Sequence, residues 1–414
     1  MEQIKLSKLL TRLRALSVFR ALLYDGPMEA LCAYLTNQEG GNEREAVSSY
    51  GEFVSQLYED SAGDMGLYIQ NKVLSVENPY IRAIGRGETP PPFMTRCVEE
   101  ELKTLQAVAA LTPNDLLGRW DGQDFLPLFS STPVDLTANY LRRIEEIGRY
   151  GYGIYAHHHM FYLENSDCIG NDGGGSKKGR SRIVPVLHPD TVQLSDLVGY
   201  QREKQLILSN TLALLAGQPA ANMLLTGDAG TGKSSTIKAV VNKLYPDGLR
   251  IIEIRRDQLR ELPAVLDELS ENPLKFILFI DDLSFQKGDD KYSALKAVLE
   301  GSVSAKSSNV VIYATSNRRH LVKETFSDRD GDDIHRGETM QEMISLSERF
   351  GLHITFQKPD KAAYLGIVHH LAEAQGVACP DLDVQAEQFA LGRGGRSPRA
   401  ARQFVNSLTV KSGK

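Results

Sequence analysis

The sequence predicts an α/β fold for its C-terminal half, a parallel β-sheet covered by helices on both faces, preceded by a mainly helical N-terminal part. Three observations carry this prediction. After residue 190, short apolar runs alternate with helical stretches, which is the pattern of βαβ units. Before residue 170 the pattern is mainly helical, and after residue 359 the strands stop and a helix-rich tail follows. We therefore expect three domains, with the ranges 1–183, 184–358 and 359–414.

Composition and charge narrow the class of protein. The chain has 414 residues, of which 42% are hydrophobic and 24% charged, as in an ordinary soluble globular protein. Its net charge of -6 attracts neither nucleic acid nor anionic membrane, so nucleic-acid binding is possible but not indicated. The four cysteines lie far apart without a CxxC pair, which favours a reducing, cytoplasmic location. No apolar run is long enough to span a bilayer, and we expect no membrane partner.

The first part of the chain offers three features and no catalytic motif. A basic N-terminal segment carries leucines at helical spacing, and a first helix packed on its own domain is favoured over a transit peptide or a membrane-surface helix. Three consecutive histidines at 157–159 cannot all face one metal ion, so a surface or core-edge position is favoured over a metal site. The segment 170–183 is rich in glycine and basic residues, and is typical of a flexible linker.

Five apolar runs after residue 190 are the strand candidates. They are "ANMLLTG" at 221–227, "LRIIEIR" at 249–255, "KFILFIDD" at 275–282, "NVVIYATSN" at 309–317 and "LHITFQ" at 352–357. Their continuous apolar character indicates strands that are buried on both faces, as in a parallel sheet.

The sequence "GDAGTGKS" at 227–234 fits the phosphate-loop motif in full, and it lies between a strand candidate and a helical run as that motif requires. Its glycines permit a backbone that turns N–H groups toward phosphate oxygens, and the following helix adds its N-terminal N–H groups. Lys233 is expected to reach the β- and γ-phosphates and Ser234 to hold Mg²⁺. The residues expected to bind the nucleotide here are Gly227, Asp228, Ala229, Gly230, Thr231, Gly232, Lys233, Ser234 and Ser235.

The strand candidate 275–280 runs straight into Asp281 and Asp282. Carboxylates at the end of a buried strand are costly unless they are paired or bound to a metal ion. In a phosphate-loop fold the metal-facing acid ends a neighbouring parallel strand, so Asp281 is expected to bind Mg²⁺. Asp282 is then placed to orient or deprotonate the attacking water.

With these motifs in place, the C-terminal half resembles an AAA+ ATPase. Residues 190–410 are more closely similar to a bacterial AAA+ family of ATP-binding proteins catalogued only as a family of unknown function. The segments "DDLSF", "LKAVLEG", "YATSNRRHL" and "LSERFGL" carry this closer similarity. The resemblance implies a P-loop NTPase sheet of AAA+ type, a small C-terminal helical lid, and ATP with Mg²⁺ as ligands.

The resemblance also implies roles for residues outside the phosphate loop. In "LSDLVGYQREK" at 194–204, Val198, Gly199 and Tyr200 would line the adenine pocket, although an ordinary loop entering a helix is an alternative. Asn317, which ends the sensor-1 strand, would contact the γ-phosphate or the attacking water. The alternative is a turn asparagine, a position that this residue type favours.

Two arginines receive roles in the same way. Arg349 in "LSERFGL" would be an arginine finger presented to the next subunit, or it simply stabilises a last helical turn before Gly351. Arg399 in "GGRSPRAARQF" would be sensor 2 of the lid, in a helix that Ser397 caps. Its alternative is a basic solvated face, because residues 386–414 hold six Lys or Arg and one Glu, a net charge of +5.

One position departs from the common AAA+ pattern. Most members place a glutamate after the metal-binding aspartate, whereas this sequence has Asp282, whose side chain is one methylene shorter. A base misplaced by about 1 Å can cost roughly a hundredfold in rate. Either the local backbone compensates for the shorter side chain, or turnover is slow.

The leading hypothesis is an ATPase that assembles as a homo-oligomer and couples ATP hydrolysis to remodelling of an unknown protein or nucleoprotein partner. A slowly hydrolysing ATP-dependent switch or loader is the alternative, favoured by Asp282 and by the lack of a recognisable pore-loop aromatic motif. A P-loop kinase acting on a small molecule is the third possibility. The sensor-like Asn317 and Arg399, together with the helical lid, argue against the kinase.

Overall fold

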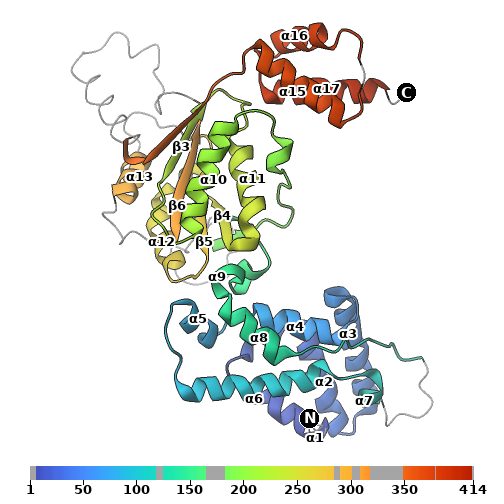
Figure 1. Ribbon diagram of the computed structural model, residues 1–414. Coiled ribbons are helices and arrows are strands. Elements are labelled where there is room, and N and C mark those ends of the chain that lie inside the picture. The colour runs from blue at the N-terminus through green and yellow to red at the C-terminus, as the bar shows by residue number, and fades with distance from the viewer. Residues whose placement is uncertain are drawn as a thin grey trace. The chain divides into compact units, whose positions relative to one another are not determined.

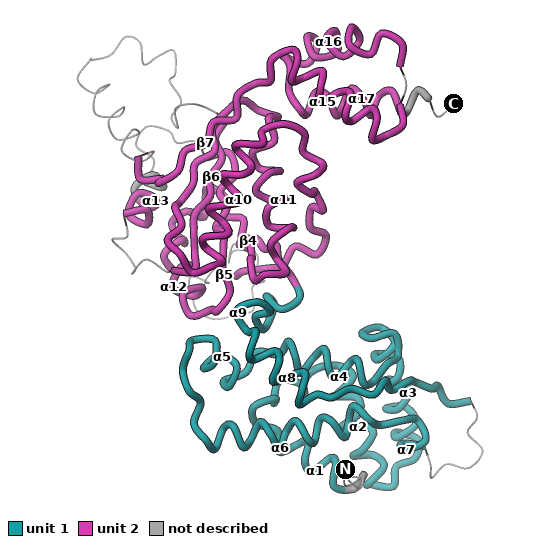
Figure 2. The backbone as a smooth tube through the Cα atoms, in the orientation of Figure 1, with its two compact units in different colours: residues 1–157 teal, residues 158–414 magenta. Residues whose placement is uncertain are grey.

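The computed structural model describes residues 6–117, 125–164, 182–283, 290–300, 308–317, 348–377 and 379–412. The chain divides into two compact units, residues 1–157 and residues 158–414 (Figure 2). The glycine-rich segment 170–183 lies outside the described residues up to residue 181. Within the part of the chain that is described, no helix combines the length and the apolar character needed to cross a bilayer.

The first unit is helical, as the sequence predicts. Its elements are α1 (Leu6–Arg14), η1 (Arg20–Tyr24), α2 (Gly26–Glu39), α3 (Glu43–Ser61), α4 (Met65–Ser75), α5 (Pro79–Gly85), α6 (Pro92–Ala109), α7 (Pro113–Leu117), α8 (Leu136–Glu145), α9 (Ile147–Tyr150) and η2 (Gly153–Ala156). Helix α1 buries Leu9, Leu10 and Leu13 in the core of this unit, which confirms the first helix predicted from the leucine spacing.

A buried carboxylate ties α6 to the turn that follows α1. Glu101 accepts hydrogen bonds from the backbone N–H groups of Ser17 (2.7 Å), Val18 (3.1 Å) and Phe19 (2.8 Å). Burial raises the pKa of Glu101, but the hydrogen bonds from Phe19, Ser17 and Cys97 together outweigh it, so the pKa of Glu101 lies below its ordinary value. A charged acid is therefore an integral part of the helical core.

The second unit is built on a seven-stranded sheet in the order β2-β1-β4-β5-β6-β3-β7 (Figure 1). The strands are β1 (Met160–Glu164), β2 (Arg182–Pro185), β3 (Met223–Gly227), β4 (Leu249–Glu253), β5 (Lys275–Ile280), β6 (Val310–Ser316) and β7 (Leu352–Phe356). The last five are the five predicted strand candidates, and they pair in parallel. The sequence did not predict β1 and β2, which extend the sheet beside β4, with β2 antiparallel to β1.

Helices cover the sheet and build a separate small bundle after it. They are η4 (Leu194–Asp196), α10 (Gln201–Leu215), α11 (Lys233–Leu244), η5 (Tyr245–Asp247), η6 (Arg256–Glu261), α12 (Leu262–Ser270), α13 (Asp290–Glu300), α15 (Lys361–Ala374), α16 (Leu382–Gly392) and α17 (Pro398–Ser412). Alternate strand residues such as Leu225 and Ile277 pack with α10 and α11, and their neighbours Leu224 and Leu278 are equally buried. The sheet is therefore covered on both faces.

The three helices α15, α16 and α17 form a lid with an apolar core of its own. In Figure 1 they stand at the end of the sheet where β3 ends. The Ser397 hydroxyl accepts a hydrogen bond from the backbone N–H of Ala400 (3.1 Å), which confirms the predicted cap of α17. The observed sheet, the C-terminal helical lid and the helical first unit confirm the predicted fold class, an α/β fold with a parallel sheet, a small C-terminal helical lid and a mainly helical N-terminal part.

Candidate nucleotide site

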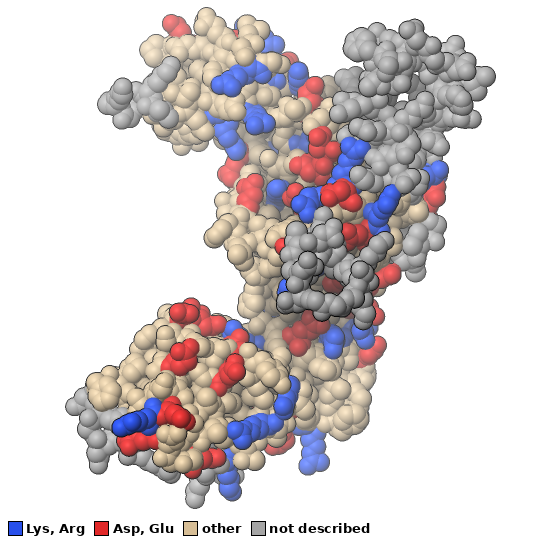
Figure 3. Space-filling model, turned by 180° about the vertical axis from the view of Figure 1, so that it is seen from behind, with Lys and Arg blue, Asp and Glu red and all other residues tan. Residues whose placement is uncertain are grey.

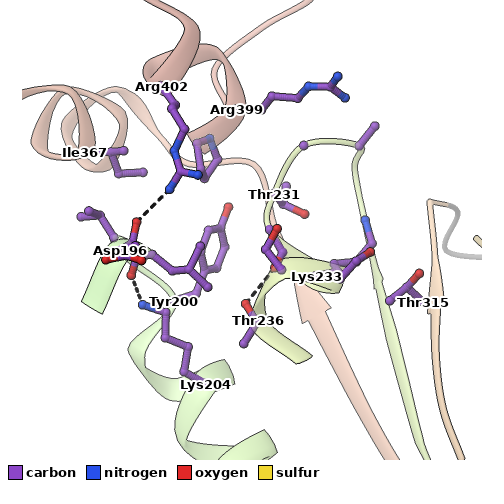
Figure 4. A pocket seen from close by; sticks show the side chains of 18 of the residues that line it. Asp196, Tyr200, Lys204, Thr231, Lys233, Thr236, Thr315, Ile367, Arg399 and Arg402 are labelled. Atoms are coloured by element: carbon purple, nitrogen blue, oxygen red, sulfur yellow. Dashed lines mark hydrogen bonds between the residues drawn. The ribbon is translucent and has the colours of Figure 1, made fainter. Parts of the chain in front are cut away.

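A cleft of about 600 Å³ lies where the carboxyl ends of β3, β5 and β6 meet the lid. Parallel strands place the residues that follow them at one edge of the sheet, which explains why segments far apart in sequence converge here. Figure 4 shows the cleft with the phosphate loop below it and the lid side chains Arg399, Arg402 and Ile367 above it. The predicted site residues that line it are Val198, Tyr200, Ala229, Gly230, Thr231, Gly232, Lys233, Ser234, Ser235, Asp281, Asp282, Asn317 and Arg399.

Close approach of other parts of the chain requires glycine at two positions of the phosphate loop. Gly227 has φ +138°, and a Cβ there would lie 2.1 Å from the carbonyl oxygen of Phe356 on the adjacent strand β7. Gly230 has φ +80°, and a Cβ there would lie 3.1 Å from the Cβ of Arg399. The first glycine lets β7 approach the loop, and the second lets the lid approach it.

The ammonium group of Lys233 lies inside the curl of this loop. It donates hydrogen bonds to the carbonyl oxygens of Gly227 (2.8 Å) and Asp228 (2.9 Å) and to Oδ1 of Asn317 (2.9 Å). These three acceptors match the three protons of the group. Burial lowers the pKa of Lys233, and the nearby carboxylates of Asp281, Asp228 and Asp282 oppose that shift.

The two aspartates after β5 contact different partners. Asp281 Oδ1 accepts hydrogen bonds from the hydroxyls of Ser234 (2.7 Å) and Thr315. Asp282 Oδ1 accepts one from the side-chain amide of Asn317 (2.8 Å). Since Asn317 also accepts from Lys233, it connects the phosphate loop to Asp282. The sequence places Asn317 correctly at this edge of the sheet, and the structure adds the two residues that it bridges.

Asp282 has a left-handed backbone, with φ +51°. Aspartate tolerates this conformation better than most residues, because its short polar side chain can bond locally. The neighbouring residues explain why it is needed: Ile280 is paired in the sheet with Ala314, and Leu283 is fully buried in the core. The chain is thus fixed on both sides of the two aspartates and must turn sharply between them.

The predicted adenine segment lies at the opposite side of the cleft from Thr315 (Figure 4). The Tyr200 ring lies 5.0 Å from that of Phe356, and its hydroxyl donates to the carbonyl of Gln357 (2.6 Å). Burial raises the pKa of Tyr200 to about 12. Val198 lines the same cleft, whereas Gly199 lines a neighbouring apolar cavity against the lid.

Sequence reasoning missed several residues that shape the cleft. Arg402 of the lid donates to the backbone carbonyl of Asp196 (3.0 Å), and the buried ammonium of Lys204 donates to that of Leu197 (Figure 4). Thr315, which contacts Asp281, was missed as well. Arg402 could have been found, because it lies one helical turn from Arg399 on α17 and so shares its face.

Arg349 lies apart from this cleft. It precedes β7, whose first residue Leu352 pairs with Met223 at the start of β3, whereas the phosphate loop follows the other end of β3. Its guanidinium forms an ion pair with Glu300, the last residue of α13. The structure therefore places the predicted site residues at the carboxyl ends of the parallel strands, and Arg349 at their amino ends.

The cleft suits a metal held by few protein oxygens. Ser234 and Asp281 offer hydroxyl and carboxylate oxygens at hydrogen-bond distance from each other, which are the donors that Mg²⁺ prefers. Across the described residues, no group of three or more His, Cys, Asp or Glu could hold a metal ion by itself. His159, one of the three consecutive histidines, contacts the side-chain oxygen of Asn242 (3.0 Å) and stacks on Tyr245.

Comparison with known protein families shows which family the chain belongs to. The family described as "Protein of unknown function (DUF815)" matches residues 175–412, which is more than half of the chain. The chain belongs to this family. The match includes the whole cleft described above and the lid of the DUF815 protein. No curated protein matches its sequence.

The solved structures with partial similarity to this chain include the following three. The Thermotoga maritima RuvB Holliday junction branch migration motor is 17% identical, with a TM-score of 0.35; the match covers 53% of this chain and 66% of RuvB, just under two thirds. C. elegans PCH-2 is 17% identical, covering 53% and 65%, with a TM-score of 0.37. A katanin structure titled for its self-assembly is 19% identical, covering 54% and 76%, with a TM-score of 0.33.

Proposed function

We propose that this DUF815 protein is an AAA+ ATPase that binds and hydrolyses ATP with Mg²⁺ and couples this to oligomer-dependent remodelling of a macromolecular partner. One observation carries the proposal: a single cleft joins a complete phosphate loop, two strand-end aspartates, a strand-end asparagine and a lid arginine. These are the parts needed to bind a triphosphate and to stabilise the charge that develops as its γ-phosphoryl group is transferred.

Each part has a separate task in this proposal. Lys233 and the N–H groups of the loop bind the phosphates, while Ser234 and Asp281 hold Mg²⁺, which neutralises charge on the β- and γ-oxygens when bound. Arg399 lies above the loop, where its backbone N–H already donates to the carbonyl of Gly230 (3.2 Å). The lid therefore contacts the phosphate loop directly, and Arg399 is one of the residues that line the cleft.

The base is Asp282, held by Asn317. Because Asn317 accepts from Lys233 and donates to Asp282, phosphates that take over the lysine change the hydrogen bonds at the base. Asn317 thereby reports the presence of the γ-phosphate to Asp282. A carboxylate released in this way can accept the proton of an attacking water.

In this proposal, Arg349 makes hydrolysis depend on assembly of the protein. At the far edge of the sheet it is separated from its own phosphate loop by the length of β3, five residues or about 16 Å. We therefore expect it to act on the nucleotide of another chain, as an arginine finger in trans. This makes hydrolysis depend on contact between copies of the protein.

The partner is an unknown protein or nucleoprotein, which the helical first unit selects. In Figure 3, acidic and basic side chains are interspersed over the first unit and the sheet domain, while Lys and Arg predominate on the visible face of the small C-terminal lid. Together with the net charge of -6, the interspersed charges of the first unit favour a protein surface over bare nucleic acid as the partner.

The proposal is tested by measuring ATP turnover per chain over a wide range of protein concentration, with the mass in solution recorded with and without ATP. An assembly-dependent ATPase shows turnover per chain that rises with concentration in parallel with the oligomer. Slow turnover that is independent of concentration would instead support the switch or loader. Transfer of the γ-phosphate to a small molecule, with no release of free phosphate, would support the kinase.

A further inference from the structure

Thr315 occupies the position where β6 meets the two aspartates, and it binds the chain after β5 with both its backbone and its side chain. Its carbonyl oxygen accepts from the backbone N–H of Leu283 (2.7 Å). Its hydroxyl oxygen accepts from the backbone N–H of Asp282 (3.0 Å). Two successive N–H groups are therefore bound by one residue, directly beyond the last paired residues of β5 and β6.

The same hydroxyl donates its proton to Oδ1 of Asp281. Since a hydroxyl has one proton and two lone pairs, it can donate to the first aspartate while accepting from the second. Thr315 is only 2% exposed, so water does not compete for these bonds. One buried hydroxyl thus fixes the orientation of Asp281 and the backbone of Asp282 together.

The hydrogen bonds of Thr315 support the left-handed backbone conformation of Asp282. The residue at this position has a side chain one methylene shorter than a glutamate, so its carboxylate can be placed only by moving the backbone. The observed φ of +51° is a conformation that needs support from its surroundings. The hydrogen bond from its N–H to Thr315 and the burial of Leu283 supply that support.

We propose that Thr315 is the positioning residue of the site, whose hydroxyl sets the backbone of Asp282 so that the short carboxylate serves as base, and orients Asp281 toward Mg²⁺. This inference rests on the proposed ATPase function for the part that concerns Asp282. The part that concerns Asp281 requires only nucleotide binding. The two parts can therefore fail separately.

Two substitutions separate the hydroxyl from the packing. Thr315→Val keeps the shape and removes the hydroxyl, whereas Thr315→Ser keeps the hydroxyl and removes the methyl group. If the hydroxyl is the group that matters, Thr315→Val lowers kcat at saturating Mg²⁺ by about tenfold to a hundredfold, the size of effect expected for a slightly misplaced base, and leaves KM for ATP at saturating Mg²⁺ unchanged. Thr315→Ser stays within a few-fold of the wild type. Should Thr315→Val not fold, as judged by thermal unfolding, Thr315→Ala carries the same expectation.

A second readout does not depend on turnover. Displacement of a fluorescent ATP analogue, with and without Mg²⁺, measures how far Mg²⁺ tightens nucleotide binding. Thr315→Val should bind nucleotide normally without Mg²⁺, but need a severalfold higher Mg²⁺ concentration for the increase in affinity. This result would stand even if the wild type proved not to hydrolyse ATP, so it distinguishes failure of this inference from failure of the ATPase proposal.

A double substitution tests whether Thr315 acts on the rate through Asp282. In the Asp282→Asn background, Thr315→Val should lower the residual single-turnover rate by less than about twofold, because the group that it positions is already gone. Additive effects, a wild-type kcat in Thr315→Val, or an equal loss in Thr315→Ser and Thr315→Val would each overturn the inference. An unchanged Mg²⁺ requirement would overturn the role toward Asp281.

Discussion

Replacing Arg349 by alanine tests the dependence of hydrolysis on assembly. In the structure this arginine lies just before β7, and the phosphate loop of the same chain begins at the far end of the paired strand β3. Five strand residues extend over about 16 Å, so Arg349 does not reach its own nucleotide. A trans-acting arginine contributes about 10³–10⁵ to kcat in other phosphoryl-transfer systems, which corresponds to about 4–7 kcal/mol of transition-state stabilisation. Arg349→Ala should therefore bind ATP and assemble normally but hydrolyse at least a hundredfold more slowly.

The effect on folding should be small by comparison. Arg349 is paired with Glu300, and the two side chains are 27% and 36% exposed. Ion pairs with this exposure contribute at most about 1 kcal/mol, because solvent screens them. Glu300→Gln is the matched control, since it removes the same ion pair and keeps the arginine. Glu300→Gln should retain assembly-dependent turnover, while Arg349→Ala loses it.

The assay is turnover per chain across protein concentrations, followed by mixing of two inactive variants. Arg349→Ala supplies an intact nucleotide site, and Lys233→Ala supplies an intact arginine. A mixed interface can combine the two, so the mixture should recover part of the wild-type rate. A lack of recovery despite proven co-assembly, or a protein that is monomeric at every ATP concentration, would refute the trans arginine.

Three further predictions concern single positions. Lys233→Ala should weaken ATP binding strongly, because it removes the buried positive charge inside the loop; an unchanged affinity for a fluorescent ATP analogue would contradict the phosphate-loop assignment. Asp282→Asn should bind ATP as tightly as the wild type and accumulate the ATP-bound state, and hydrolysis at the wild-type rate would show that Asp282 is not the base. Glu101→Gln should lower the free energy of unfolding by about 2 kcal/mol at pH 7, since three backbone N–H groups lose a charged acceptor. Because the pKa of Glu101 is lowered in the folded state, its contribution to the free energy of unfolding is fully present above the ordinary pKa of 4.5 and is lost as the pH falls through the folded pKa. Urea unfolding at pH 7 and pH 3.5 should therefore show a smaller difference in unfolding free energy between wild type and variant at the lower pH.

The features that depend on short-range patterns could be predicted from the sequence. The phosphate loop has fixed spacing, and the five parallel strands are continuous apolar runs, so both could be predicted and both are present. Strands β1 and β2 were not predicted, because they are short and flank the glycine-rich segment, away from the regular alternation of strand and helix. Strand β1 is placed by its pairing with β4 and β2 by its pairing with β1, and the contact with β4 is a long-range one that no local pattern displays.

The same limit explains why Thr315 was missed while Asn317 was found. A threonine within a strand is ordinary, since its branched side chain suits a strand wherever it occurs. What distinguishes Thr315 is the turn of another strand beside it, where Asp282 has a left-handed backbone. The sequence raised the question of a short base, and only the packing of β5 against β6 shows how the backbone accommodates it.

The hydrogen bonds of the site form one continuous chain, and this determines how its variants should be interpreted. Each neighbouring pair in it is bonded directly: Ser234 to Asp281, Asp281 to Thr315, Thr315 to the backbone of Asp282, Asp282 to Asn317, and Asn317 to Lys233. Groups in one network show non-additive effects, because removing any member also disturbs the others. A substitution of Lys233 is therefore expected to affect the position of Asp282 as well as phosphate binding. A substitution of Asn317 is expected to affect the same two properties. Double substitutions within this hydrogen-bond network are therefore needed to separate the contribution of the phosphate loop to ATP binding from that of Asp282 to hydrolysis.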